Sequence, residues 1–333
     1  MTSSIGRRRL LAALGVALAL PRSAIAQQSA STATADPPGA LVSASWLTGR
    51  LEDQNLLVLD IRSAADGGGF DAFRTGHIPG AVHSNYDTAG WRVTRGRLPL
   101  MLPTIPQLEA LIGDLGIDSD SRVVVVSAGL HASDFSSAAR VYWTLKVSGV
   151  TSVSILDGGF AAWRAAPGSA MESGSGQISP TIFTATIDKN LVAELDEVEG
   201  IERRGGATLV DARRAAFFSG KTKVAAVKAF GHIPRALNLD SAAFYDFRAN
   251  RLKPKAELAK IAAALPDGPI VTYCNSGQWS ATDWFVLSEL LQRKNVKLYF
   301  GSMIEWASDP RRRLETVHHG RNLSSRSSLE PRI

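Results

Sequence analysis

The hexapeptide GHIPGA at residues 76–81 returns as GHIPRA at residues 231–236, an offset of 155 residues (231 − 76). Each copy follows an apolar run that ends in an Asp-x-Arg triplet, at residues 60–62 in the first half and 211–213 in the second. The same order of signals in both halves of the chain indicates an internal repeat, with a period of about one domain.

Both halves then continue with the same kinds of segment. An apolar run, Val123 to Val126 or Ile270 to Tyr273, precedes a helical stretch, Ala138 to Val147 or Thr282 to Leu291. Short apolar strands that alternate with helices predict α/β domains with mainly parallel sheets. Ligands of such sheets bind beyond the carboxyl ends of the strands. The side chains expected at such ends are Asp60, Ala128, Asp211 and Cys274.

The length of 333 residues suits two domains rather than one core. Gly/Ser-rich residues 168–182 are interpreted as the linker between domains at 41–167 and 183–310. The net charge of +6 lies at the ends, because residues 1–26 and 311–333 each contribute +4 and leave 6 − 4 − 4 = −2 for the body. No basic face for nucleic acid is therefore expected, and the basic tail at 311–333 is interpreted as a frayed, solvated end.

The amino terminus has the pattern of an export signal at residues 1–26. Three arginines, Arg7 to Arg9, precede the apolar run Leu10 to Leu20, and Ala24-Ile25-Ala26 fits a small-x-small cleavage site. The order of Gly6 and the arginines resembles a twin-arginine signal, with the general secretory route as the alternative. The run is too short for a permanent membrane span. We therefore expect a periplasmic protein with a flexible leader at residues 27–40.

Export makes the single cysteine, Cys274, informative. Without a second cysteine it cannot form an internal disulfide. It is a reactive thiol, half of an intermolecular bridge, or a buried inert residue.

Together, the Asp-x-Arg strand ends, the GHIP turns, the cysteine loop and the closing motif Leu156-Asp-Gly-Gly-Phe160 with Trp163 resemble the rhodanese family of sulfurtransferases. The resemblance covers about residues 41–310. It implies two tandem domains, each with a mainly parallel five-stranded sheet flanked by helices. It also implies that Cys274 carries sulfane sulfur as a covalent persulfide, without a cofactor or metal.

Sulfur transfer requires a thiolate at Cys274, since the thiolate is the nucleophile. We expect the amides that follow the cysteine, up to Ser280, to curl around an anionic sulfur that is open to small molecules. Gly277 permits positive φ in this turn, and Ser280 is the expected N-cap of the next helix. The predicted loop residues are Asn275, Ser276, Gly277, Gln278, Trp279 and Ser280.

The loop also discriminates between related activities. A cysteine phosphatase of the Cys-x5-Arg type needs an arginine where this chain has Ser280, so that activity is excluded. The Ser276-Gly277 pair resembles the loop of mercaptopyruvate-type enzymes, whereas thiosulfate-type loops carry cations that are absent here. Trp279 either shields the persulfide or packs at the rim. Relatives often carry a substrate arginine where this chain has Phe217, which leaves the donor open.

Other residues have functional and structural alternatives. Arg213 either binds an anionic donor or braces the loop through Asp211, and the bracing role is preferred. His77 and His232 occur once per repeat and are expected to hydrogen-bond their turns. In the first domain Ala128 or a neighbour occupies the thiol position, so that domain is expected to be non-catalytic and to wall one side of the cleft. Asp134 is expected to cap a helix or to face that cleft.

The sequence thus predicts a periplasmic, monomeric sulfurtransferase that takes sulfur from thiosulfate or 3-mercaptopyruvate and delivers it to a thiol or cyanide acceptor. One alternative is a module of the same fold that binds sulfur or a partner without turnover. Another is dimerisation through Cys274.

Overall fold

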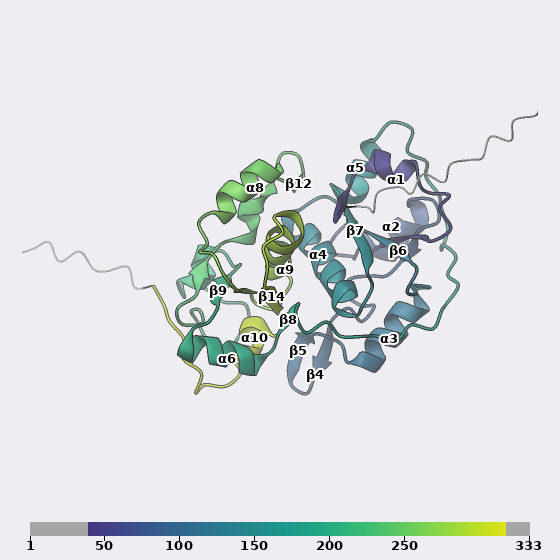
Figure 1. The fold of residues 1–333 in the computed structure, drawn as a ribbon. Helices are drawn as coiled ribbons and strands as arrows, with labels where there is room; N and C mark the ends of the chain where they lie inside the picture. The colour runs from purple at the N-terminus through teal and green to yellow at the C-terminus, as the bar shows by residue number, and fades with distance from the viewer. Residues whose placement is uncertain (1–38, 318–333) are drawn as a thin grey trace, which may run out of the picture. The chain divides into compact units, whose positions relative to one another are not determined.

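The computed structural model describes residues 39–317 (Figure 1). The expected signal at residues 1–26, the leader up to residue 38 and residues 318–333 of the tail lie outside the described residues. The described part contains two parallel five-stranded sheets with helices around them, which confirms the expected α/β architecture.

The sheet of the first domain has the strand order β1-β7-β6-β2-β3, and all its neighbouring strands are parallel. Its strands are β1 (Leu41–Val42), β2 (Leu56–Asp60), β3 (Val82–His83), β6 (Arg122–Val126) and β7 (Ser152–Leu156). The four valines of β6 are buried, as expected for a central strand that is covered on both faces. A separate antiparallel hairpin consists of β4 (Val93–Arg95) and β5 (Leu98–Met101).

The helices of the first domain are α1 (Ala44–Thr48), α2 (Gly69–Thr75), α3 (Ile105–Asp114), α4 (Ala132–Val147) and α5 (Gly159–Ala165). Helix α4 begins six residues before the predicted start at Ala138. It has 16 residues, nearly all of them buried. A helix that is buried around its whole circumference lies inside the protein rather than on its surface.

The second domain repeats the first strand for strand. Its sheet has the order β10-β9-β13-β14-β8, again all parallel, which is the first domain's order counted from the opposite edge. The strands are β8 (Val192–Ala193), β9 (Thr208–Asp211), β10 (Leu237–Asn238), β13 (Ile270–Tyr273) and β14 (Val296–Tyr299), with a small hairpin of β11 (Tyr245–Asp246) and β12 (Arg251–Leu252).

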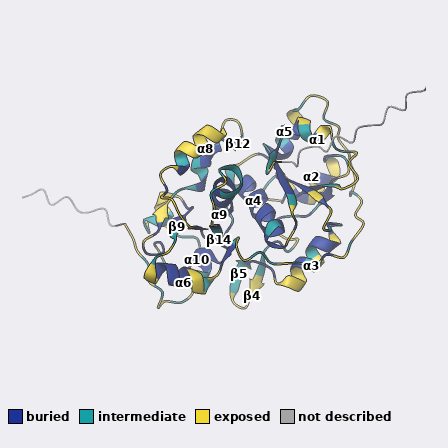
Figure 2. Cartoon of the chain, viewed as in Figure 1, coloured by how far each residue is buried: buried dark blue, intermediate teal, exposed yellow. Residues whose placement is uncertain are grey.

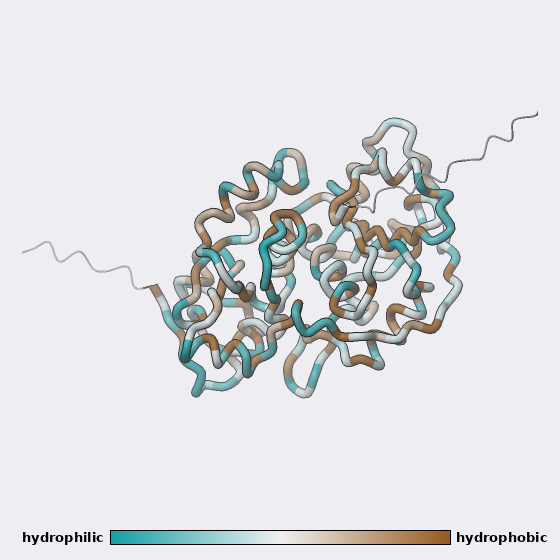
Figure 3. The backbone as a smooth tube through the Cα atoms, viewed as in Figure 1, coloured by the Kyte–Doolittle hydropathy of each residue, from teal (hydrophilic) through white to brown (hydrophobic). Residues whose placement is uncertain are grey.

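The helices of the second domain are α6 (Leu195–Arg204), α7 (Ala215–Phe218), α8 (Lys255–Ala262), α9 (Trp279–Trp284) and α10 (Ser302–Trp306). A π-helical segment, Phe285–Leu290, continues α9, and a 3₁₀ turn covers Ser241–Phe244. Teal and brown alternate along α8 in Figure 3, as expected for a helix with one apolar face. The segment 215–230 contains the short helix α7.

The two domains share one apolar core where α4 contacts α9. Both helices are dark blue at the centre of Figure 2, whereas the outer helices carry yellow faces. Phe285 packs edge-on against Phe135 and Tyr142, with ring centroids 5.8 and 5.0 Å apart. Such aromatic pairs contribute about 0.5–1.5 kcal/mol each beyond the burial of their area. The interface therefore packs α4 against α9 and the π-helical segment that continues it.

An identical brace holds the strand end to the GHIP turn in each domain. Arg62 pairs with Asp60 and donates to the carbonyl of Gly76 at 2.9 Å. Arg213 pairs with Asp211 and donates to the carbonyl of Gly231 at 2.8 Å. All four side chains of these pairs are buried.

The two histidines of the GHIP turns hydrogen-bond main-chain carbonyls, as expected. Nδ1 of His77 hydrogen-bonds the carbonyl of Phe73 at 2.8 Å, and Nδ1 of His232 hydrogen-bonds the carbonyl of Phe218 at 2.7 Å. Each ring also stacks on the phenylalanine that supplies that carbonyl.

The segment after each domain folds back on the same turn. Residue Glu172 of the linker pairs with His77, and Glu315 pairs with His232, in isolated antiparallel bridges. The expectation of a frayed tail is therefore wrong for residues 311–317. Arg312 and Arg313 form ion pairs with Glu199 and Glu202 of α6, which hold this part of the tail against the domain. Within residues 39–317, no helix has the length and apolar character needed to cross a bilayer.

Candidate active site

Cys274 follows the last residue of the central strand β13, at the carboxyl edge of the second sheet. The amide of Gly277 donates to its Sγ at 3.1 Å. Its own amide donates to the hydroxyl of Ser302 at 3.0 Å, and that hydroxyl donates to the carbonyl of Tyr299 at 2.9 Å. The cysteine is thus anchored on both sides, and one main-chain N–H points at the sulfur.

The turn between Cys274 and α9 depends on Gly277, whose φ is +81°. Helix α9 begins at Trp279 with Gln278 as its N-cap, so the expectation that Ser280 caps this helix is wrong. The turn is two residues tighter than expected. Ser280 therefore lies inside the helix, with a buried hydroxyl that has no hydrogen-bond partner among the described residues.

Access to the sulfur differs from the expectation. Cys274 is only 1% exposed, so the sulfur is not open to small molecules in this conformation. The same burial disfavours an intermolecular disulfide through Cys274, because the two sulfurs of a disulfide must come into direct contact.

The first domain holds the loop that carries the sulfur. The side-chain amide of Gln278 donates to the hydroxyl of Ser137 at 3.0 Å and to the carbonyl of Ser133 at 3.2 Å. Nη1 of Arg92 donates to Oε1 of Gln278 at 3.2 Å. Nη1 of Arg140 donates to the carbonyl of Ser276, also at 3.2 Å. The loop sequence is uncharged, yet two arginines of the first domain contact it.

Arg213 lies next to the loop but is fully engaged. It is 1% exposed, and besides Asp211 and Gly231 it contacts Oδ1 of Asn275 at 3.4 Å. Because Arg62 makes the same brace in the domain without cysteine, the geometry favours the structural role of Arg213 over direct donor binding.

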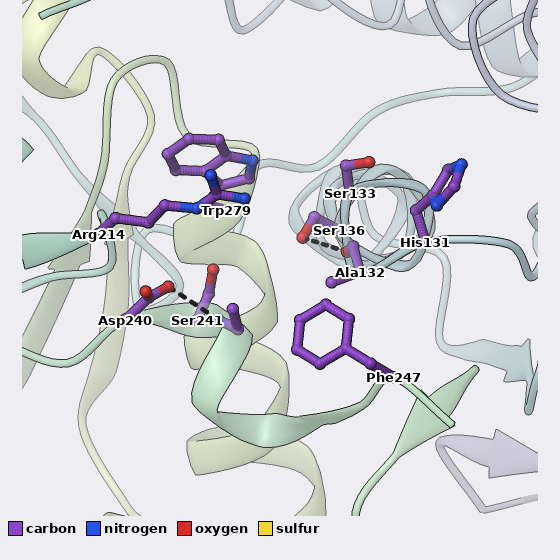
Figure 4. A pocket seen from close by; sticks show the side chains of 10 residues that line it. His131, Ala132, Ser133, Ser136, Arg214, Asp240, Ser241, Phe247 and Trp279 are labelled. Carbon is purple, nitrogen blue, oxygen red and sulfur yellow. Dashed lines mark hydrogen bonds between the residues drawn. The ribbon is translucent and has the colours of Figure 1, made fainter. Parts of the chain in front are cut away.

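A pocket of about 270 Å³ opens between the two domains beside the loop (Figure 4). Its walls carry Ser133, Ser136 and His131 of α4 and its N-cap on one side, and Arg214, Asp240 and Trp279 on the other. Phe247 closes a further side and is 64% exposed. Among loop residues 274–280, only Trp279 lines this pocket. Arg214 supplies a cation at the pocket.

Trp279 lines the pocket and packs edge-on against Phe217, with ring centroids 5.9 Å apart. We expect Trp279→Ala to accelerate alkylation of Cys274 by iodoacetamide, because the indole no longer fills the approach from the pocket. The loss of partly buried area should cost about 1–2 kcal/mol of stability. Phe247→Ala, on another wall of the same pocket, is the matched control and should leave the alkylation rate unchanged. Equal rates in Trp279→Ala and the wild type would show that the indole does not control access.

The structural counterpart of Cys274 in the first domain is Ser127. Ile61, the residue after β2, donates its amide to the carbonyl of Val126. Ala212, the residue after β9, donates its amide to the carbonyl of Tyr273, so Val126 and Tyr273 occupy corresponding positions. The next residues are Ser127 and Cys274. The carbonyl of Ser127 accepts from the amide of Phe160, and the carbonyl of Cys274 accepts from the amide of Met303. The thiol position thus holds a buried serine, one residue before Ala128.

Two buried carboxyl groups flank the loop region. Asp134 accepts from the amides of Leu130 and His131 and caps α4 from its first turn rather than from the N-cap position, which His131 holds. Burial raises the pKa of Asp134. Asp283 on α9 is fully buried, and neither of its oxygens has a hydrogen-bond partner among the described residues. Burial, followed by the charge of Asp240, raises the pKa of Asp283 well above its usual range.

Sequence reasoning did not identify Arg92, Arg140 or His131 as residues of this site. Arg140 had one usable signal, since it is the only charged residue between Ser136 and Leu145 in an otherwise apolar or small-residue helix. Nothing near Arg92 distinguishes it from Arg95 and Arg97. Among residues 39–317, no group of three or more His, Cys, Asp or Glu side chains could hold a metal ion.

Comparison with known proteins agrees with this architecture. The model of the rhodanese-like domain matches residues 43–166 and 194–309. The 3-mercaptopyruvate sulfurtransferase of Escherichia coli K12 is 31% identical over 275 residues, covering 80% of this chain and 94% of its own. The thiosulfate sulfurtransferase of Corynebacterium glutamicum is 34% identical over 303 residues, covering 86% and 93%.

Among solved structures, the 3-mercaptopyruvate sulfotransferase SseA of Escherichia coli superposes with a TM-score of 0.67 at 30% identity. The superposition covers 80% of this chain and 99% of that one. The chain therefore belongs to the rhodanese-like family, as a tandem-domain sulfurtransferase.

Proposed function

We propose that the protein moves sulfane sulfur from a small anionic donor, thiosulfate or 3-mercaptopyruvate, to a thiol or cyanide acceptor through a persulfide on Cys274. The observation that carries this proposal is the amide of Gly277, 3.1 Å from Sγ at the carboxyl edge of the sheet. A main-chain N–H aimed at sulfur favours its anionic form, which is the nucleophile.

The first step forms a bond between Sγ and the outer sulfur of the donor. With thiosulfate, the donor's S–S bond breaks and sulfite leaves with the bonding electron pair. With 3-mercaptopyruvate, the C–S bond breaks, and the carbon that keeps the electron pair takes a proton to give pyruvate. In the second step the acceptor attacks the outer sulfur, and the Cys274 thiolate leaves. Because sulfur stays covalently attached between the steps, the cycle requires no cofactor.

The pocket beside Trp279 is the proposed entrance for donor and acceptor. Arg214 offers a charge to an anionic donor there. Since Cys274 is 1% exposed, turnover requires the indole or the loop to move aside transiently.

The test is incubation with each donor, removal of the donor, and measurement of the intact mass. We expect the wild type to gain one sulfur atom and Cys274→Ala to gain none. Cyanide should then remove that sulfur as thiocyanate. No mass gain with either donor would overturn the proposal.

The burial of Cys274 gives weight to a second candidate, a module that binds sulfur without turnover. This candidate predicts that the added sulfur stays on the protein when cyanide or a small thiol is supplied. The same mass measurement therefore separates the two candidates.

We also propose that the protein acts in the periplasm as a monomer. The sequence pattern of residues 1–26 supports export, with the arginine pair favouring the twin-arginine route. Subcellular fractionation of cells that express the full chain would test it, since recovery in the cytoplasm without cleavage would contradict export.

A further inference from the structure

We propose that the first domain supplies the positive charge of the sulfur site: Arg140 fixes the Ser276–Gly277 peptide against Cys274 and balances the negative charge of the sulfur held there. This inference rests on the proposed function, in which the sulfur is an anion. It assigns a part in the reaction to the domain that has no cysteine.

Arg140 comes from the middle of α4 and is 0% exposed. Its Nη1 donates to the carbonyl of Ser276 at 3.2 Å. The same nitrogen lies so close to Gly277 that a Cβ there would collide with it. Gly277 is the residue whose amide donates to Sγ. The guanidinium thus contacts the peptide unit that presents its N–H to the sulfur.

Apart from this contact, the guanidinium of Arg140 lies 5.0 Å from the centroid of the Trp143 ring. Neither Nε nor Nη2 has a hydrogen-bond partner among residues 39–317. No carboxylate forms an ion pair with this guanidinium in the described part of the chain. A fully buried cation without a counter-charge is costly, so its retention needs a reason. An anionic sulfur next to Gly277 would provide the missing counter-charge.

Among residues 39–317, Arg140 is a buried charge beside the loop that has no carboxylate partner. Burial raises the pKa of Tyr86 to about 12 and lowers the pKa of Arg140 to about 10. At neutral pH the phenol is therefore uncharged and the guanidinium is charged. Burial also raises the pKa of Asp283 well above its usual range, which favours its uncharged form, and Arg213 is paired with Asp211.

Arg92 is the second arginine of the first domain that contacts the loop. It lies over the ring of Tyr86 at 4.1 Å and binds the loop through Gln278. Unlike Arg140, it has an ion-pair partner, Asp87, at 2.8 Å. Arg92 therefore acts mainly as a positioning residue, and Arg140 carries the charge. Together they replace the cations that the loop sequence lacks.

The test compares Arg140→Met, which removes the charge, with Arg140→Lys, which retains it. Because the chain has one cysteine, the difference in thiolate ultraviolet absorbance between each protein and its Cys274→Ala version reports on this thiol alone. We expect the ionisation midpoint to move to higher pH by about one unit in Arg140→Met and by much less in Arg140→Lys. Persulfide formation should slow by about tenfold or more in Arg140→Met.

Arg293→Met is the matched control. Arg293 also donates to main-chain carbonyls, those of Ala262 and Pro266, but it lies outside the loop. It should leave both readouts unchanged. An ionisation midpoint in Arg140→Met equal to that of the wild type would overturn the inference, and so would an equal shift in Arg293→Met.

Two further measurements keep the outcome clear. If Arg140→Met does not fold, Arg140→Lys decides: an ionisation midpoint near the wild type with near-normal persulfide formation supports the charge role, and loss of persulfide formation despite an intact fold contradicts it. A wild type that ionises as expected but gains no sulfur would refute the proposed function. The absorbance comparison of Arg140 variants would still decide the present inference.

Discussion

Moving the thiol from position 274 to position 127 is expected to abolish sulfur transfer. In the double variant Ser127→Cys/Cys274→Ser the thiol occupies the corresponding strand end of the first domain. We expect sulfur transfer to cyanide to fall by more than about 1000-fold, the scale seen when a catalytic nucleophile is lost. The physical reason is that the two strand ends are alike in backbone but not in surroundings.

Within residues 39–317, Ser127 has no counterpart of the hydrogen bonds that Gly277 and Arg140 make at the loop of Cys274. Among the described contacts, the main-chain carbonyl of Ser127 accepts from Phe160, and Arg62 of that domain is occupied by Asp60. A cysteine at position 127 would therefore remain a buried thiol.

Initial rates with both donors, together with intact mass, would measure the effect. The single variant Ser127→Cys is the control and should retain wild-type turnover, with sulfur on one of its two cysteines only. A persulfide on the thiol at position 127 of the double variant would show that a cysteine at the strand end is sufficient for sulfur uptake. The cysteine loop and α4 would then not be required.

Gly277→Ala is the second substitution with a large expected effect. At φ +81° any side chain is strained, and a Cβ would also lie 2.9 Å from the carbonyl oxygen of Phe300 and against Nη1 of Arg140. We expect a loss of about 2–4 kcal/mol in the free energy of unfolding. Displacement of the Gly277 amide from Sγ should also lower the rate of sulfur transfer by about 100-fold.

Gly80→Ala separates the two causes. Gly80 has a similar φ of +72°, but nothing lies within 4 Å of a Cβ placed there. We therefore expect it to cost only the backbone strain, about 1 kcal/mol, without an effect on activity. Thermal unfolding and initial rates on both variants would measure this. Similar losses of activity in Gly80→Ala and Gly277→Ala would mean that the loop geometry is not specific to sulfur transfer.

Much of the fold was predictable because the determining signals are local and occur twice. Each sheet's central strands are short apolar runs, and the brace joins residues two apart, Asp60 with Arg62 and Asp211 with Arg213. The shared order of motifs then predicts the shared topology, which the strand orders confirm. The loop at 274–280 was also predictable as a unit, since its residues are contiguous.

Other features needed atomic detail. The start of α9 at Trp279 depends on how tightly the turn at Gly277 closes, so Ser280 was wrongly expected at the N-cap. The match of Ser127 with Cys274 follows from hydrogen-bond register, which motif spacing leaves uncertain by one residue. The packing of residues 311–317 depends on ion pairs to α6 that composition cannot reveal.

The sequence alone determined the two α/β repeats, the position of the cysteine at a strand end and the family, because each of these depends on residues that are close together in the chain. Which cations contact the cysteine loop, and how deeply Cys274 is buried, follow only from the packing of the two domains. That packing brings Arg140 to a loop 134 residues further along the chain (274 − 140). Contacts across such a separation depend on how two helix surfaces fit together, so no local sequence pattern predicts them.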